Sequence, residues 1–167
     1  MTAPLGAASP AVGELAPDFE LPNQFGEPVR LSAFRGRPVV VIFFPFAFSG
    51  ICTGELCEIR DGWDAFADVE AEVLAVSVDS KFAQRAYAAA EGYEFSLLAD
   101  FWPHGEVARR YGVFDEASGM ALRGTFILDA EGVVRYRVVN PRGQARDMQE
   151  YRAALAEISA QAPHTSA

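Results

Sequence analysis

The sequence contains few residues that bind metals or form disulfides: two cysteines, Cys52 and Cys57, and two histidines, His104 and His164. A secreted disulfide scaffold would need more cysteines in a shorter chain. The C-x4-C spacing is neither a zinc knuckle nor the C-x-x-C redox motif, and the histidines lie far apart in sequence. The sequence therefore predicts no structural zinc site, and no cofactor is expected.

The chain also lacks a long hydrophobic run and an excess of positive charge. Its longest apolar stretch, residues 38–48, is too short to span a bilayer and contains Pro45. Residues 1–15 have neither the basic start nor the apolar run of a secretory signal, so we expect a cytoplasmic protein. The formal net charge of −9 argues against binding to nucleic acid or to an anionic membrane surface.

The composition and length are those of one folded domain. Half of the residues are hydrophobic and 22% are charged, which is a normal globular mixture. A chain of 167 residues fits one domain with a sizeable core, and the sequence shows no internal repeat or linker. We expect a flexible tail at 1–12, a single domain at 13–160 and a second flexible tail at 161–167.

Strand and helix patterns alternate along the chain. Uniformly apolar, β-branched runs at 39–44 and 73–78 predict strands buried on both faces. Further strands are expected at 18–21, 28–31, 97–98, 124–128 and 133–138. Helices are expected at 51–69, from Asp79 or Ser80 to Gly92, at 103–111 and at 147–158. Pro103 is expected in the first turn of the third helix, and Ser32 is expected to cap one further helical turn. This order predicts an α/β fold with a mixed central sheet flanked by helices.

The helix expected at 51–69 has one apolar and one polar side. The apolar stripe recurs at spacings of 4, 3, 4 and 3, which is typical of a buried helical face. It consists of Cys52, Leu56, Ile59, Trp63 and Phe66. We expect Cys57, in contrast, to project toward the polar side with Asp61 and Asp64.

Cys52 stands in the first turn of this helix, directly after a predicted buried strand. Open α/β sheets place their sites at the carboxyl ends of parallel strands. The free N–H groups and the dipole of a helix N-terminus favour the thiolate, which is the nucleophilic form of cysteine. Position alone nevertheless fits a small core residue equally well, because free cysteine is often buried and inert.

The residues around Cys52 favour the reactive interpretation. The segment PFAFSGIC, residues 45–52, has the pattern P-x3-[ST]-x2-C, and here the sequence resembles the peroxiredoxin family. The resemblance extends over residues 13–158 and implies a thioredoxin-like fold with extra elements. The stretches FWPHG, YGVF and RGTF are most similar to the alkyl hydroperoxide reductase E subgroup.

The resemblance implies a thiol-dependent peroxidase that reduces hydrogen peroxide and organic hydroperoxides in antioxidant defence. It makes Cys52 the peroxidatic cysteine, Pro45 a shield of the thiolate, Ser49 a hydroxyl on the peroxide oxygen, and Arg123 a donor to thiolate and substrate. Donors aimed at the charge that moves onto the departing oxygen lower the barrier, and arginine presents several in a fixed fork. Taken singly, Pro45 fits a strand terminator, Ser49 a helix cap and Arg123 a surface ion-pair partner.

The resemblance also suggests residues around this centre. Glu55 and Arg146 match family positions that form a charged shell around the catalytic arginine, although singly each fits a solvated surface charge. Phe48, Phe101 and Trp102 match an apolar rim or dimer contact, whereas the residues alone favour core packing. The family implies a homodimer and a reductant that is thioredoxin-like, mycoredoxin-like or a low-molecular-weight thiol.

Cys57 departs from the subgroup-E pattern, which typically works with one cysteine. Its C-x4-C spacing is similar to the bacterioferritin-comigratory, or peroxiredoxin Q, subgroup, where the second cysteine resolves the sulfenic acid. In an ideal helix the two Cα atoms would be about 8.7 Å apart, beyond the limit of roughly 7 Å for a disulfide. Resolution therefore requires the first helical turns to unwind, which Gly50 and Gly54 favour. The alternative is a bystander thiol.

Two other functions stay open at this point. One is a redox-sensing or chaperone-like binding protein that Cys52 oxidation switches, and oxidation-coupled binding without peroxide turnover would favour it. The other is a disulfide reductase of the thioredoxin type, against which the missing C-x-x-C argues.

Overall fold

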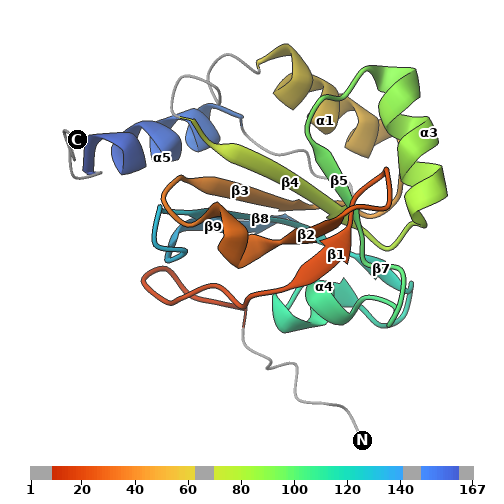
Figure 1. The fold of residues 1–167 in the computed structure, drawn as a ribbon, viewed down its shortest axis with the longest axis horizontal. Helices are drawn as coiled ribbons and strands as arrows, with labels where there is room; N and C mark the ends of the chain where they lie inside the picture. Colours follow the sequence, from red (N-terminus) through yellow and green to blue (C-terminus); the bar gives the residue numbers. More distant parts are fainter. Residues whose placement is uncertain (1–8, 63–69, 141–147, 162–167) are drawn as a thin grey trace, which may run out of the picture.

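The computed structural model describes residues 9–62, 70–140 and 148–161, and within them the side chains of 50–55, 140, 148 and 159–161 are not described. A mixed five-stranded sheet lies at the centre, in the order β5-β4-β3-β8-β9 (Figure 1). Its strands are β3 (Val39–Phe43), β4 (Glu72–Ser77), β5 (Ser96–Ala99), β8 (Arg123–Leu128) and β9 (Val134–Asn140). β3, β4 and β5 run parallel, whereas β8 is antiparallel to both β3 and β9.

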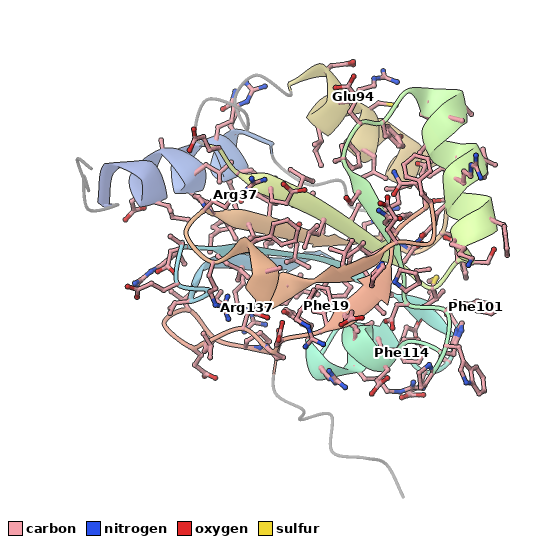
Figure 2. The ribbon with its side chains drawn as sticks, viewed as in Figure 1. Phe19, Arg37, Glu94, Phe101, Phe114 and Arg137 are labelled. Atoms are coloured by element: carbon pink, nitrogen blue, oxygen red, sulfur yellow. The ribbon has the colours of Figure 1, made fainter. Side chains whose placement is uncertain are left out.

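Helices cover both faces of this sheet, so the protein has two apolar cores (Figure 1). On one face lie α1 (Gly50–Asp61), α3 (Lys81–Glu91) and α5 (Met148–Gln161). The other carries α4 (Glu106–Arg110), the hairpin of β1 (Glu20–Pro22) and β2 (Pro28–Arg30), and the 3-10 helix η1 (Leu31–Phe34). Because strand side chains alternate, Val40 and Ile42 of β3 enter the first core, while Val41 enters the second. Figure 2 shows Phe19 on the α4 side.

The predicted central strands are confirmed, and their burial explains their composition. Every residue of β3 and of β8 is buried. Such strands need no polar face, so they carry continuous apolar runs instead of alternating patterns. The α/β fold with a mixed sheet and flanking helices is therefore confirmed, and α3 begins after the Ser80 cap and ends at left-handed Gly92 as expected.

The helix expected at 103–111 is shorter than predicted, and Pro103 is not in its first turn. Gly105 has a φ of 71°, a left-handed conformation that a right-handed helix cannot include, so α4 begins at Glu106. The Asp100 carboxylate accepts hydrogen bonds from two backbone N–H groups of this helix, at 3.1 and 2.9 Å. Burial raises the pKa of this carboxyl to about 6.

Two further differences concern short elements. Ser32 lies inside η1 and caps nothing; its N–H and hydroxyl both donate to Asp18 at 2.9 Å, tying η1 to the segment before β1. A small hairpin of β6 (Phe114–Asp115) and β7 (Met120–Ala121) was not predicted, because two-residue strands are too short to show a periodic pattern.

Several sequence-based expectations fall on residues outside the described ranges. These are the outer parts of both predicted tails, 1–8 and 162–167, and the end of the helix expected at 51–69. α1 ends at Asp61 with Gly62 as its C-cap, so the helix expected at 51–69 stops earlier than predicted. Trp63, Asp64 and Phe66 lie outside the described ranges. Within the described ranges, no helix is both long and apolar enough to cross a membrane.

Candidate functional site

Cys52 is the third residue of α1, and α1 begins just beyond the carboxyl end of β3. Residues 44–49, here called the β3–α1 loop, connect the two. The N–H groups of a first helical turn have no intrahelical partner, and the helix dipole is positive at this end. The backbone at position 52 therefore lies where an anionic sulfur is stabilised. The side chain of Cys52 itself is outside the described part.

The β3–α1 loop contains Pro45, which follows β3, and Ser49, which precedes α1. Pro45 is buried beyond the last residue of β3. Ser49 is the N-cap residue of α1, with extended backbone, but its side chain makes no capping hydrogen bond. The Ser49 Oγ is buried and finds no partner in the part of the chain that the structure describes. Since an unsatisfied buried hydroxyl costs about 1–3 kcal/mol, this oxygen is suited to bind a ligand.

Arg123 is the first residue of β8 and only 4% exposed, so it is not the surface ion-pair partner that its residue type alone suggested. The β3–β8 register sets Ile42 opposite Thr125. Because the two strands are antiparallel, Arg123 at the start of β8 lies toward the end of the sheet at which β3 stops. The buried, positively charged Arg123 guanidinium therefore comes from the same end of the sheet as the start of α1.

A chain of polar groups holds the β3–α1 loop. The Ala47 N–H donates to Oδ2 of Asp79 at 2.8 Å, and the Ser77 hydroxyl donates to the same oxygen at 2.6 Å. Gln84 Nε2 in turn donates to Ser77 Oγ at 3.0 Å and to the Leu98 carbonyl at 2.7 Å. Ser77 and Gln84 are fully buried. The loop is thus hydrogen-bonded to the end of β4, and through it to α3 and β5.

Phe48 follows Ala47, the residue whose N–H is anchored to Asp79, and has an unusual backbone conformation. Its φ is 66°, in the left-handed region that bulky residues rarely adopt. Such strained residues persist only where their surroundings hold them, and they concentrate at functional sites. The Phe48 ring lies 4.9 Å from the Tyr87 ring, centroid to centroid. The Asp79 anchor and this ring contact together hold the loop.

The sequence indicates Asp79 only as a possible start of the helix that ends at Gly92, not as a site residue. Ser80 caps α3 instead, because its side chain accepts the Ala83 N–H. The available signal was an acidic residue at the carboxyl end of β4, the strand next to β3. Its partner, the Ala47 N–H, lies 32 residues earlier in the chain and has no sequence signature.

We expect Asp79→Ala to slow oxidation of Cys52 by about 100-fold, because small misplacements of reacting groups have effects of that size. The rate is measured by stopped-flow mixing of the reduced protein with peroxide. Ser80→Ala is the matched control, since it removes the α3 cap and lowers stability without touching the loop. Equal rates in both variants would show that Asp79 does not position the loop.

The prediction that Cys57 projects toward the polar side of α1 is wrong. It is half-buried and packs against the core that contains Leu56 and Ile59. Its Sγ lies 3.5 Å from Glu91 Oε2 and 3.5 Å from the Tyr93 hydroxyl oxygen, and its thiol is free. The end of α3 and the start of the next segment cover this side of α1, a tertiary contact that helical periodicity does not reveal.

The remaining predicted site residues have mixed outcomes. The side chain of Glu55 and the whole of Arg146 lie outside the described part. Phe48, Phe101 and Trp102 are 57%, 53% and 81% exposed, so the expectation of core packing is wrong. Figure 2 shows Phe101 at the edge of the molecule. Among the described residues, no three His, Cys, Asp or Glu side chains gather to hold a metal ion.

Comparisons with known proteins find relatives over most of the chain. The AhpC/TSA family matches residues 12–137. Alkyl hydroperoxide reductase E of Mycobacterium tuberculosis is 43% identical over 150 residues, covering 89% of this chain and 98% of the relative. The human mitochondrial thioredoxin-dependent peroxide reductase is 35% identical over 152 residues, covering 85% of this chain and 59% of the relative.

Solved structures show the same fold. Peroxidoxin BcpB of Mycobacterium tuberculosis is 33% identical with a TM-score of 0.79, over 91% of this chain and 98% of that one. AhpC of Enterococcus faecalis is 32% identical with a TM-score of 0.82, over 93% of this chain and 96% of that one.

Proposed function

Since the chain belongs to the AhpC/TSA family and is a peroxiredoxin, we propose that it reduces hydroperoxides through a sulfenic acid on Cys52. The Cys52 thiolate attacks one peroxide oxygen, the O–O bond breaks, and the other oxygen leaves as an alcohol or as water after gaining a proton. The observation that carries the proposal is the P-x3-S-x2-C segment, which leads into the N-terminus of α1. Buried Arg123 begins β8 at the same end of the sheet.

Two side chains are proposed to stabilise the charge that moves during this attack. Arg123 presents several fixed N–H donors and never loses its charge. Ser49 has a buried hydroxyl with no hydrogen-bond partner among the described residues. Donors already in place for a departing oxygen lower the barrier because they need no reorganisation during the reaction. Pro45, buried at the end of β3, is proposed to exclude water from the sulfur.

Cys57 is proposed to react with the sulfenic acid and form an intramolecular disulfide with Cys52, as the second cysteine does in the peroxiredoxin Q subgroup. The disulfide protects Cys52 from further oxidation and is a substrate for an external dithiol. A thioredoxin-like reductant fits this product, and one relative is named a thioredoxin-dependent peroxide reductase. A mycoredoxin-like donor or a low-molecular-weight thiol, a cytoplasmic location and a homodimer stay predictions.

Intact mass after one equivalent of peroxide tests the role of Cys57. We expect a product about 2 Da lighter than the reduced protein, because forming a disulfide removes two hydrogens. In Cys57→Ser we expect a product about 16 Da heavier, which is the sulfenic acid. A wild-type protein that accumulates the heavier product is instead a one-cysteine peroxidase reduced by an external thiol. Oxidation-coupled binding to a partner without turnover would favour the binding-protein alternative.

A further inference from the structure

A polar cluster surrounds the Cys57 thiol where α1 meets the end of α3. The thiol donates to the Glu91 carboxylate, and its sulfur also contacts the Tyr93 hydroxyl, both at 3.5 Å. The Tyr93 hydroxyl donates to that of Tyr87 at 3.3 Å. A resolving thiol must lose its proton to become a nucleophile, and here a carboxylate already accepts a hydrogen bond from the thiol.

Arg60 holds the Glu91 end of α3 against α1. One Arg60 nitrogen donates to the Glu91 carbonyl at 2.5 Å and lies 3.8 Å from the Glu91 carboxylate. Arg60 is also paired with Asp61 on the exposed side of the helix. Burial raises the pKa of Tyr93 well above its usual value, so its hydroxyl stays protonated and is able to turn from Tyr87 to the sulfur.

We propose that Glu91 is the general base of the resolving step and that Tyr93 orients the thiol for it, an inference that rests on the proposed role of Cys57. Glu91 takes the thiol proton, and the Cys57 thiolate attacks the sulfur of the Cys52 sulfenic acid. The S–S bond forms as the S–O bond breaks, and the departing hydroxide leaves as water with the proton that Glu91 held. The sulfenic acid supplies the oxidising equivalents, so no other oxidant is required.

The packing of α1 keeps Cys57 with its base during this step. Leu56 and Ile59, on either side of Cys57, are fully buried in the core. The first half of the helix contains Gly50 and Gly54, which lower its helical preference. The second half is therefore the fixed part, and the unwinding that a disulfide requires brings Cys52 to Cys57. The contact with Glu91 survives this movement.

Stopped-flow oxidation separates the two steps, with formation of the sulfenic acid first and of the disulfide second. Glu91→Gln keeps the shape but cannot take a proton at neutral pH. We expect the first rate to be unchanged and the second to fall about 100-fold, the lower range for loss of a general base. The second rate in this variant is also expected to rise with pH more steeply than in the wild-type protein, because hydroxide must then remove the thiol proton.

Glu94→Gln is the matched control, because Glu94 is exposed and the substitution makes the same change in charge. We expect wild-type rates for both of its steps. Glu91→Asp keeps a carboxylate and is expected to recover part of the second rate, which an effect on folding alone would not explain. If Glu91→Gln forms the disulfide at the wild-type rate with the wild-type pH profile, the role of Glu91 is wrong. A wild-type protein that forms no disulfide overturns this role and that of Cys57 together.

Discussion

Replacing Cys52 with serine is expected to abolish peroxide consumption and to leave the fold intact. The serine hydroxyl is not ionised near neutral pH, whereas a cysteine at a helix N-terminus readily forms the nucleophilic thiolate. The substitution exchanges one atom in the first turn of α1, which either residue type tolerates. Peroxide loss is measured in the presence of an excess of dithiol, and circular dichroism checks the fold.

The Cys57→Ser variant is the matched control for this experiment. It makes the same atomic change five residues later in α1 but leaves the proposed nucleophile in place. We expect it to retain the initial oxidation rate of Cys52, because its effect falls on the later step. Substantial turnover by Cys52→Ser, with any reductant, would move the active site to another part of the molecule.

Arg123→Ala is expected to slow oxidation of Cys52 by one to three orders of magnitude. A single donor to a developing negative charge is worth roughly 2.7–4 kcal/mol in other enzymes, which is about 100- to 1000-fold in rate. The thiolate also becomes harder to form when a neighbouring positive charge is removed. The second-order rate constant for peroxide is measured by stopped flow as a function of pH.

Two further arginine variants separate the possible causes. Arg123→Lys keeps the charge but not the planar fork of donors, so we expect a partial loss. Arg137→Ala removes the same charge from an exposed position on β9, labelled in Figure 2, and is expected to react at the wild-type rate. An unchanged rate constant in Arg123→Ala would mean that the guanidinium does not face the site.

The central sheet was predictable because its signals are local. The apolar, β-branched run at 39–44 is typical of a strand covered on both faces, and the structure has β3 there. The Ser80 cap and the glycine at position 92 likewise set the ends of α3. The late start of α4 was not predictable, because a glycine's left-handed conformation depends on what packs around it.

The part of the site that depends on tertiary contacts could not be predicted. The motif singled out Pro45 and Ser49 by their spacing from the cysteine, but nothing in the sequence links Asp79 to a backbone N–H of the loop. The surroundings of Cys57 depend in the same way on how α3 ends against α1. Helical periodicity describes one helix at a time, so it could not predict that Cys57 contacts Glu91 and Tyr93.

The β3–α1 loop implies a trade-off between stability and activity. The left-handed Phe48 and the buried Ser49 hydroxyl each cost of the order of 1–3 kcal/mol in the folded state. Glycine at position 48 or alanine at position 49 would relieve these costs, and selection for thermal tolerance alone would favour both. The same changes would loosen the loop or remove a proposed donor. Heat-adapted forms of this domain are therefore expected to gain stability elsewhere and to retain this loop.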